Sequence, residues 1–167
     1  DNINTDAIYP GKYTYRDNLS PAEMAAVAIS NFPTRIPISD GSVLIAGYNF
    51  GCGSSREQAA TCLKHAVVKA VITASVNETY QRNAFNNGFL VLQSPELIHY
   101  LRQQHSVPPL EIDINFSTWT LTLMNQQHSV QSFAFDPVSE VGQQLIIDGG
   151  IEGSVRKREL RPNQAML

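Results

Sequence analysis

The chain has 167 residues, of which 43% are hydrophobic and 16% are charged, a balance typical of globular rather than disordered proteins. Its formal net charge of −3 excludes the overall basic field that nucleic-acid-binding domains carry. We expect a single domain over residues 1–167, because a domain usually has about 150 residues.

Turn-forming residues dominate the start of the chain. The polar stretch DNINTDAIYPGKYTYRDN, interrupted by Pro10 and Gly11, predicts a loop around a short strand. Ser20 and Pro21 then predict a helix start, with serine as the cap and proline at the first helical position.

Short apolar runs alternate with helical patterns through the middle of the chain. The runs at 42–46, 70–72 and 89–92 predict buried strands. Apolar residues recur at helical spacing from Ser55 onward, and further helices are expected at 77–86 and from Ser94. This alternation is typical of βαβ units and indicates a largely parallel sheet.

The pattern changes after Pro108 and Pro109. Alternating apolar and polar residues at 110–116, 119–123 and 130–135 predict antiparallel strands with one solvated face, and a turn is expected at 125–128. A last helix is expected from Pro137 to the Gly149-Gly150 pair. The basic residues at 155–158 are interpreted as a solvated tail. The whole predicts a compact α/β domain with layered sheets and helices.

Cysteines and histidines give no sign of a metal site. Cys52 and Cys62 form neither a CxxC pair nor a disulfide framework, which favours a reduced, cytoplasmic setting. No apolar run is long enough to span a bilayer, and no signal-peptide pattern opens the sequence, which begins at Asp1. We expect the chain itself to bind no metal, because metal-ligand spacing is absent among its histidines, His65, His99, His105 and His128.

The most unusual stretch is GYNFGCGSSREQAA, at 47–60. A strand that ends in a glycine-rich turn and runs directly into a helix presents backbone N–H groups, and these suit an anion together with the helix dipole. Gly51 and Gly53 permit backbone conformations closed to other residues. Arg56 adds a planar fork that matches a carboxylate or a phosphate. Ser54 and Ser55 place two hydroxyls at this predicted anion pocket, as candidates for a nucleophile or a base.

Simpler interpretations of this stretch can be tested by comparing its residues with those that known motifs require. The Walker pattern needs a lysine before Ser54, and the dinucleotide fingerprint needs a glycine where Arg56 stands, so neither fits. Ser54 to Glu57 also reads S-x-x-E, the pattern of a helix capping box. A cap would explain Ser54 and Glu57 without chemistry, but it would not explain the accompanying glycines and Arg56. On the residues alone, both alternatives stay open.

Several blocks of the sequence resemble a known family. GYNFGCGSSREQAA, followed by KAVITAS and YQRNAFNNG, is similar to the small subunit of 3-isopropylmalate dehydratase and, more broadly, to the swivelling domain of the aconitase superfamily. The opening NTDAIYPGKY and the ending LIIDGGIE match the start and the last helix of that domain. The resemblance covers nearly the whole chain. It implies a layered β/β/α swivelling domain with a mixed sheet and flanking helices.

The resemblance implies a hydro-lyase subunit that is active only with a large partner subunit. The reaction would isomerise or dehydrate a substituted malate, such as 2-isopropylmalate to 3-isopropylmalate in leucine biosynthesis. A [4Fe–4S] cluster is expected on the partner, where its open iron binds the leaving hydroxyl, and none is expected in this chain, whose two cysteines are too few. The alternatives are a small subunit of homoaconitase or dimethylmalate dehydratase, or a non-catalytic anion-binding domain of the same fold.

The resemblance also assigns roles to individual residues. Ser54 matches the family's catalytic base, which takes a proton from the carbon beside a carboxylate. Ser55 and Arg56 match positions that hold the carboxylates of the dicarboxylic or tricarboxylic substrate. Asp6 matches an acidic residue near the active site and, with Lys12, is counted among the expected substrate-binding residues. Gly51 and Gly53 are expected to give the anion loop its shape.

The substrate is less well specified, because one position departs from the family pattern. Lys12 stands where the family commonly has an arginine that binds a carboxylate, and lysine keeps the charge but loses the bidentate fork. Tyr13, Thr14 and Tyr15 match the segment that lines the pocket for the variable group of the substrate. Tyr13 and Tyr15 could equally be packing aromatics. Arg82, in the block YQRNAFNNG, is expected to be a structural support.

Overall fold

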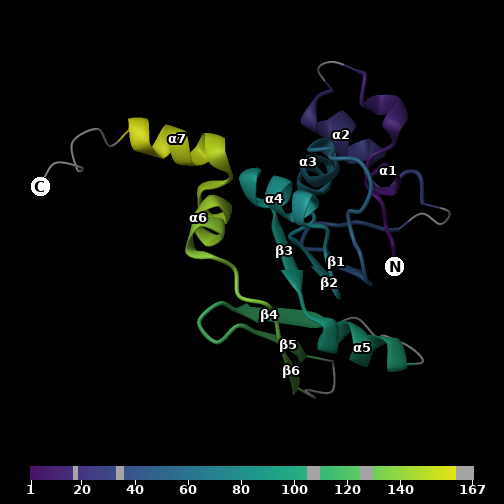
Figure 1. Ribbon diagram of the computed structural model, residues 1–167, viewed down its shortest axis with the longest axis vertical. Helices are drawn as coiled ribbons and strands as arrows, with labels where there is room; N and C mark the ends of the chain where they lie inside the picture. Colours follow the sequence, from purple (N-terminus) through teal and green to yellow (C-terminus); the bar gives the residue numbers. More distant parts are fainter. Residues whose placement is uncertain (17–18, 33–35, 105–109, 125–129, 161–167) are drawn as a thin grey trace, which may run out of the picture.

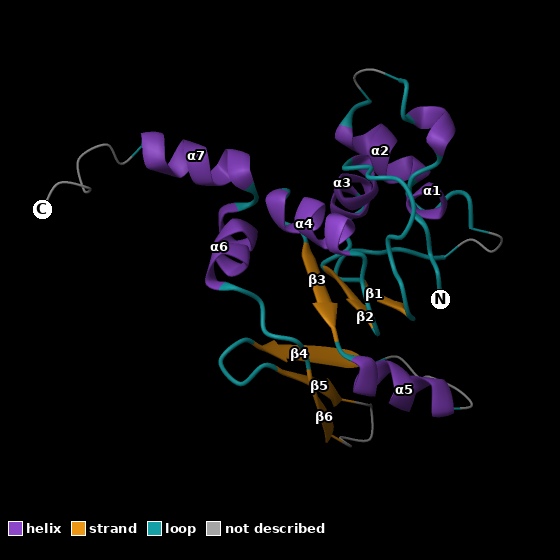
Figure 2. Ribbon diagram, in the orientation of Figure 1, coloured by secondary structure: helices purple, strands orange, loops and turns teal. Residues whose placement is uncertain are grey.

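The computed structural model describes residues 1–16, 19–32, 36–104, 110–124 and 130–160. In this part of the chain, two three-stranded sheets lie one below the other in the view of Figures 1 and 2, with helices around them. The α/β class predicted from the sequence is confirmed. The parallel and the antiparallel strands form two separate sheets.

The first sheet is parallel, and its strands lie in the order in which they occur in the chain. Its central strand is buried along its whole length, as expected for a strand covered on both faces. The prediction of a buried strand at 42–46 is wrong in its burial, because β1 forms the edge of the sheet and Ile45 is 40% exposed. Helices α3 and α4 make the two crossovers, which confirms the predicted βαβ rhythm. The elements are β1 (Val43–Ala46), α3 (Gln58–His65), β2 (Ala70–Thr73), α4 (Glu78–Asn86) and β3 (Leu90–Gln93).

The second sheet is antiparallel and is reached through helix α5, which runs from the end of β3. Leu121 and Leu123 are buried, and Thr122 between them bonds to Ser132 across the strands at 3.1 Å. The predicted alternation of buried and solvated residues is therefore confirmed; the turn predicted at 125–128 lies outside the described residues. The elements are α5 (Pro95–Gln103), β4 (Glu111–Asn115), β5 (Thr120–Met124) and β6 (Val130–Ala134).

The N-terminal segment folds differently from the prediction. Instead of a short strand it forms helix α1 (Thr5–Ile8) and the 3-10 turn η1 (Gly11–Tyr13). The reason is local, because the Asn4 side chain accepts a hydrogen bond from the N–H of Ala7 at 2.8 Å and so caps α1. The predicted start of the next helix, α2 (Pro21–Val27), is confirmed, and Ser20 forms a full capping box with Glu23.

The C-terminal part contains one helix more than predicted. Helix α6 (Glu140–Asp148) ends at Gly149, whose φ of +82° is the left-handed conformation that closes many helices. The chain then forms α7 (Ile151–Glu159), so the interpretation of 155–158 as a tail is wrong. Arg156, Lys157 and Arg158 lie in the last turn of α7, where positive charge offsets the helix dipole.

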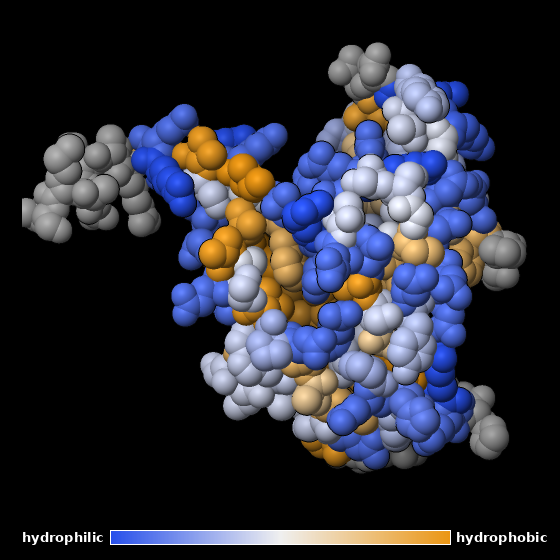
Figure 3. All heavy atoms as spheres, in the orientation of Figure 1, coloured by the Kyte–Doolittle hydropathy of each residue, from blue (hydrophilic) through white to orange (hydrophobic). Residues whose placement is uncertain are grey.

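Helix α7 stands away from the two sheets and lies against α6 (Figure 1). Apolar surface is visible over both helices in Figure 3. It comes from side chains such as Ile147, Ile151 and Val155, which are 70%, 48% and 48% exposed. The two apolar cores lie elsewhere, one around α3 with Phe50 and Leu63, the other between the sheets.

Substitution of Gly51 by alanine should lower the free energy of unfolding by about 2–4 kcal/mol. Gly51 has a φ of +73°, and a Cβ built there would lie 2.3 Å from Cγ of the fully buried Tyr80. Urea denaturation measures the loss. Gly41→Ala is the matched control: its φ is +86° but no atom lies within 4 Å of the new Cβ, so only backbone strain is added. Equal losses for the two variants would contradict the account of Gly51.

Candidate functional site

The glycine loop, defined here as residues 50–57, is bonded to the N-terminal segment of the chain. The N–H of Gly51 donates to the carbonyl of Ile3 at 2.7 Å, and the N–H of Thr5 donates to the carbonyl of Cys52 at 2.8 Å. The Thr5 hydroxyl, in a residue only 3% exposed, donates to the carbonyl of Ser54 at 2.9 Å. Two segments that are remote in the sequence therefore form one structural unit.

In the glycine loop, more backbone carbonyls than N–H groups have a hydrogen-bond partner. The carbonyls of Phe50, Cys52 and Ser54 each accept a hydrogen bond. Among the described residues, however, no acceptor is found for a continuous run of N–H groups that follows. A row of free N–H groups suits an anion. The run comprises the N–H groups of Gly53, Ser54, Ser55, Arg56 and Glu57.

The two predicted serines lie on open surface. Ser54 and Ser55 are both exposed, and the Ser54 hydroxyl lies 3.5 Å from that of Thr5. A base that acts on a substrate must be accessible, so the position of Ser54 is compatible with the predicted role, which stays a prediction. Gly53, with a φ of +97°, turns the chain immediately before Ser54.

Arg56 is held by a carboxylate. Its Nη1 donates to Oδ1 of Asp6 at 2.8 Å and to the carbonyl of Tyr9 at 3.1 Å, and its side chain is 21% exposed. Oδ1 of Asp6 also accepts from the N–H of Gly11 at 2.7 Å. The hydrogen bond from Arg56, followed by that from Gly11, lowers the pKa of Asp6 below its ordinary value. Asp6 was predicted among the substrate-binding residues, and the structure makes it the partner of Arg56.

The turn that leads into the predicted specificity segment, Tyr13 to Tyr15, lies close to Arg56. A Cβ on Gly11 would lie 3.2 Å from Nη2 of Arg56, so the turn η1 passes close to the guanidinium. The next residue, Lys12, is exposed, with its Nζ 5.1 Å from the ring centroid of Tyr13. The guanidinium of Arg16 lies 5.2 Å from the same centroid. Two cationic groups therefore lie close to the ring of Tyr13.

The three residues after Lys12 differ in burial. Tyr13 packs partly into the core and lies 6.3 Å from the ring of Tyr9, so it is a packing aromatic. Tyr15 is 91% exposed and does not pack. Oγ1 of Thr14 is buried without a hydrogen-bond partner in the described part of the chain.

The alternative of a capping box at Ser54–Glu57 is wrong. Helix α3 begins at Gln58, later than the predicted Ser55, and Glu57 occupies the N-cap without a side-chain cap bond. Oε1 of Glu57 instead accepts a hydrogen bond from Nδ2 of Asn87 at 2.8 Å. Ser54 is therefore free of the simplest structural role that its pattern allowed.

Sequence reasoning missed Thr5, the residue that supports Ser54 directly. Its position in the block Asn4-Thr5-Asp6 is a signal for the N-terminal segment, but no local pattern indicates that Thr5 reaches the glycine loop. Asn31, also missed, donates to Oδ2 of Asp6 at 3.2 Å. Arg82, expected to be a support, is exposed.

No group of three or more His, Cys, Asp or Glu side chains that could hold a metal ion is found within the described ranges. Cys62 is buried, and burial raises the pKa of its thiol to about 12, so it stays protonated and is unsuited to ligate iron. Cys52 is partly exposed and stands alone. The residues of this part of the chain do not fit an iron–sulfur cluster.

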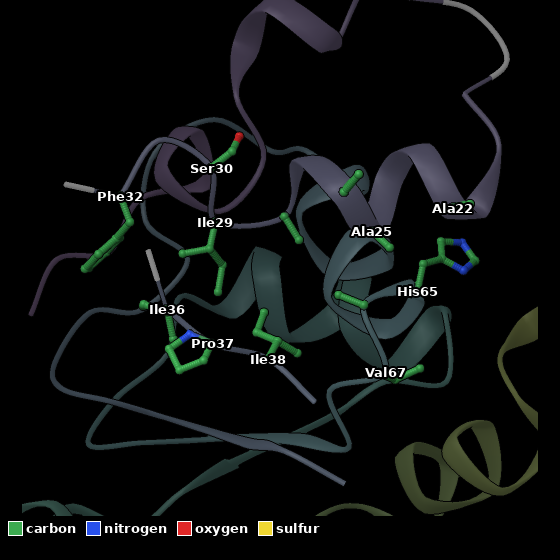
Figure 4. Close-up of a pocket in the computed structure, with 13 residues that line it drawn as sticks. Ala22, Ala25, Ile29, Ser30, Phe32, Ile36, Pro37, Ile38, His65 and Val67 are labelled. Carbon is green, nitrogen blue, oxygen red and sulfur yellow. The ribbon is translucent and has the colours of Figure 1, made fainter. Parts of the chain in front are cut away.

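A cavity of about 1000 Å³ lies apart from the glycine loop, between α2, residues 28–32 and 36–38, and the end of α3 (Figure 4). Apolar side chains such as Ile29, Ile36 and Ile38 line it, and His65 lies at its edge near Ala22 and Ala25. None of the predicted site residues contributes to it. The candidate site is therefore the open surface at Ser54 and Arg56, not this cavity.

Comparison with known proteins agrees with the resemblance carried by the glycine loop. Residues 1–97 match the model of the aconitase C-terminal domain. The chain belongs to this family. Over 96% of the chain, its structure superposes with a TM-score of 0.76 and 27% identity on 90% of the crystal structure of 3-isopropylmalate dehydratase (LeuD) from Methanocaldococcus jannaschii. The layered aconitase-type domain expected from the sequence is thereby confirmed.

Curated relatives of this aconitase-type domain include mitochondrial homoaconitases. The protein from Candida albicans is 41% identical over 98% of the chain, and that from Yarrowia lipolytica is 39% identical over 93%. The chain spans about a quarter of the length of each, 25% and 24%. None of the helices in the described residues is long and apolar enough to cross a membrane. The cytoplasmic setting stays a prediction.

The bond between Asp6 and Arg56 should make stability depend on pH. Because the folded pKa of Asp6 is lowered from 3.8, its contribution is fully present above about pH 5 and is lost as the pH falls through 3.8 toward the folded value. Asp6 is half exposed, so we expect Asp6→Asn to cost at most about 1 kcal/mol near pH 7 and nothing at the acid end.

Thermal unfolding of the wild type and of Asp6→Asn, from neutral pH down to the acid end, measures the difference in their stability. Asp40→Asn is the matched control, because Asp40 forms a more exposed pair with Lys69 at the same 2.8 Å distance. A pH-independent difference between wild type and Asp6→Asn would contradict the account.

Proposed function

We propose that this chain is the swivelling domain of an aconitase-type hydro-lyase, with Ser54 as the base that removes a proton from carbon. The observation that carries the proposal is an exposed Ser54 hydroxyl among free N–H groups, beside an arginine held in place by Asp6. Family membership supports the reaction class, since homoaconitase and 3-isopropylmalate dehydratase are among the relatives.

In the proposed reaction, Oγ of Ser54 acts as an alkoxide and takes a proton from the carbon beside a substrate carboxylate. The electron pair left on that carbon forms a double bond to the neighbouring carbon, whose bond to the hydroxyl breaks. Addition of that hydroxide to the carbon that lost the proton, with a proton delivered to the carbon that lost the hydroxyl, gives the isomer. Ser54 returns the proton in that step, so no other reactant is needed.

A serine hydroxyl is too weak an acid to ionise at neutral pH without help. The free N–H groups of the glycine loop supply that help, and each well-placed donor contributes roughly 3 kcal/mol. Arg56 and Ser55 bind a substrate carboxylate in this proposal. Because Asp6 and Tyr9 engage Nη1 of Arg56, its Nη2 is the nitrogen directed to the substrate.

The site requires a partner. Ser54 and Ser55 lie on open surface, which gives no shelter from water to a reacting carbanion. We propose that a large subunit, or the further polypeptide that longer relatives contain, covers the glycine loop and carries the [4Fe–4S] cluster. In that assembly the cluster supplies a Lewis acid for the leaving hydroxyl, and this chain supplies the base and the carboxylate contacts.

The charge near Arg56 favours a tricarboxylic, homocitrate-type substrate. Lys12 and Arg16 flank the ring of Tyr13 and offer partners for a third carboxylate. The identity with homoaconitases over nearly the whole chain supports the same choice. The second candidate is 2-isopropylmalate, as in leucine biosynthesis, and the superposition on 3-isopropylmalate dehydratase favours it.

Replacement of Ser54 by alanine should lower kcat about a thousandfold with little change in KM, because the base acts in the transition state. The assay uses the chain reconstituted with its iron–sulfur partner. Ser55→Ala is the matched control, since it removes a neighbouring exposed hydroxyl and should raise KM more than it lowers kcat. A Ser54→Ala enzyme with unchanged kcat would refute the assignment of the base.

The substrate class can be decided with the same assembly. Homocitrate-type acids should give a higher kcat/KM than 2-isopropylmalate, and Arg16→Met should lower kcat/KM about tenfold for the tricarboxylic acid only. The reverse preference would select the second candidate. Failure to turn over either acid, with Ser54 intact, would favour the non-catalytic anion-binding alternative.

A further inference from the structure

We infer that Glu57 and Asn87 form a second anchor of the glycine loop and act as positioning residues for Ser54 and Arg56. The inference rests on the proposed function, in which Ser54 and Arg56 meet the substrate. Glu57 directly follows Arg56, and its carboxylate accepts a hydrogen bond from Nδ2 of Asn87 at 2.8 Å. Because Asn87 directly follows α4, this bond ties the start of α3 to the end of α4.

Asn87 is itself fixed by its neighbours. Its Nδ2 also donates to the carbonyl of Asn83 at 2.9 Å, which orients the side-chain amide toward Glu57. Its carbonyl accepts a hydrogen bond from Nζ of Lys64 at 2.7 Å, and Lys64 extends from the far end of α3. Asn87 therefore links both ends of α3 to the end of α4.

The turn between α6 and α7, at Gly149 and Gly150, packs directly against the end of α4. A Cβ on Gly88 would lie 2.3 Å from the carbonyl carbon of Gly149, and one on Gly150 would lie 2.7 Å from the carbonyl oxygen of Asn86. The two backbones are thus in direct contact, where the end of α4 meets the α6–α7 corner (Figure 1). Nζ of Lys64 also bonds to the carbonyl of Gly149 at 3.2 Å. This packing leaves Asn87 little room to move.

The anchor bears on function because the reactive groups are its sequence neighbours. The N–H groups of Arg56 and Glu57 belong to the free run that faces the proposed anion. A shift of about 1 Å in groups that contact a reacting substrate can slow catalysis about a hundredfold. With Thr5 and Asp6 on one flank and Asn87 on the other, the loop is fixed on both sides of Ser54 and Arg56.

Amide hydrogen exchange of the isolated chain tests the anchor without reference to any substrate. The N–H groups of Ala59, Ala60 and Thr61 donate to the carbonyls of Arg56 and Glu57, so their exchange reports opening at the start of α3. Asn87→Ala and Glu57→Ala should each accelerate this exchange about tenfold. Glu57→Gln retains an acceptor oxygen and should restore slow exchange. The double alanine variant should be no faster than Asn87→Ala, because the bond between Glu57 and Asn87 is already lost in that variant.

Thr122→Ala is the matched control, since it removes a side-chain bond between two strands, to Ser132, in the other sheet. Unchanged exchange at 59–61 in Asn87→Ala, or equal acceleration by Thr122→Ala, would overturn the inference.

In the reconstituted enzyme, Asn87→Ala should lower kcat more than tenfold with a smaller effect on KM, and Glu57→Gln should recover most of the rate. A purely structural role would lower the melting temperature without this split, and that result would also overturn the inference. An assembly inactive even with the wild-type chain would count against the proposed function alone, because accelerated exchange would still establish the anchor.

Discussion

The pairing of residues 3–6 with the glycine loop is the constraint on which the site depends. The N–H and the hydroxyl of Thr5 satisfy the carbonyls of Cys52 and Ser54, and the carbonyl of Ile3 accepts the N–H of Gly51. Within the described residues, the N–H groups from Gly53 to Glu57 are left without an acceptor. A loop that satisfied its donors internally would be more stable by itself, but it would have nothing to offer an anion. The attachment to the N-terminal segment replaces that internal bonding and keeps the donors free.

The charged side chains near Ser54 are also paired within the protein. Asp6 neutralises much of the field of Arg56, so the guanidinium serves geometry as much as charge. The positive potential at Ser54 then comes from aligned N–H dipoles, which need no counter-ion and do not reorganise during a reaction. Lys12 lies in η1 and Arg16 just after it, and in the proposed function their charges distinguish one substrate from another rather than activate the base.

The sequence was most informative where apolar runs and glycines dominate. Strands β1 to β3 were predicted from short continuous apolar runs, although only β2 is buried along its whole length, and β4 to β6 because one solvated face imposes alternation. Helix α1 was missed because a single Asn4 cap decides it, and α7 because a polar helix against one neighbour shows little periodicity. Glu57 was misread because its partner Asn87 is distant in the sequence, and the pairing of Asp6 with Arg56 escaped prediction for the same reason.

The central claim is that the free N–H groups beside Ser54, together with Arg56, make the glycine loop a site for anions. Titration of the ¹⁵N-labelled chain with citrate, followed by amide chemical shifts, tests it most directly. The account predicts saturable shifts concentrated at Gly53 to Glu57 and at the Arg56 side chain. Saturable shifts that leave these amides unmoved and gather elsewhere, for instance around the apolar cavity, would contradict it.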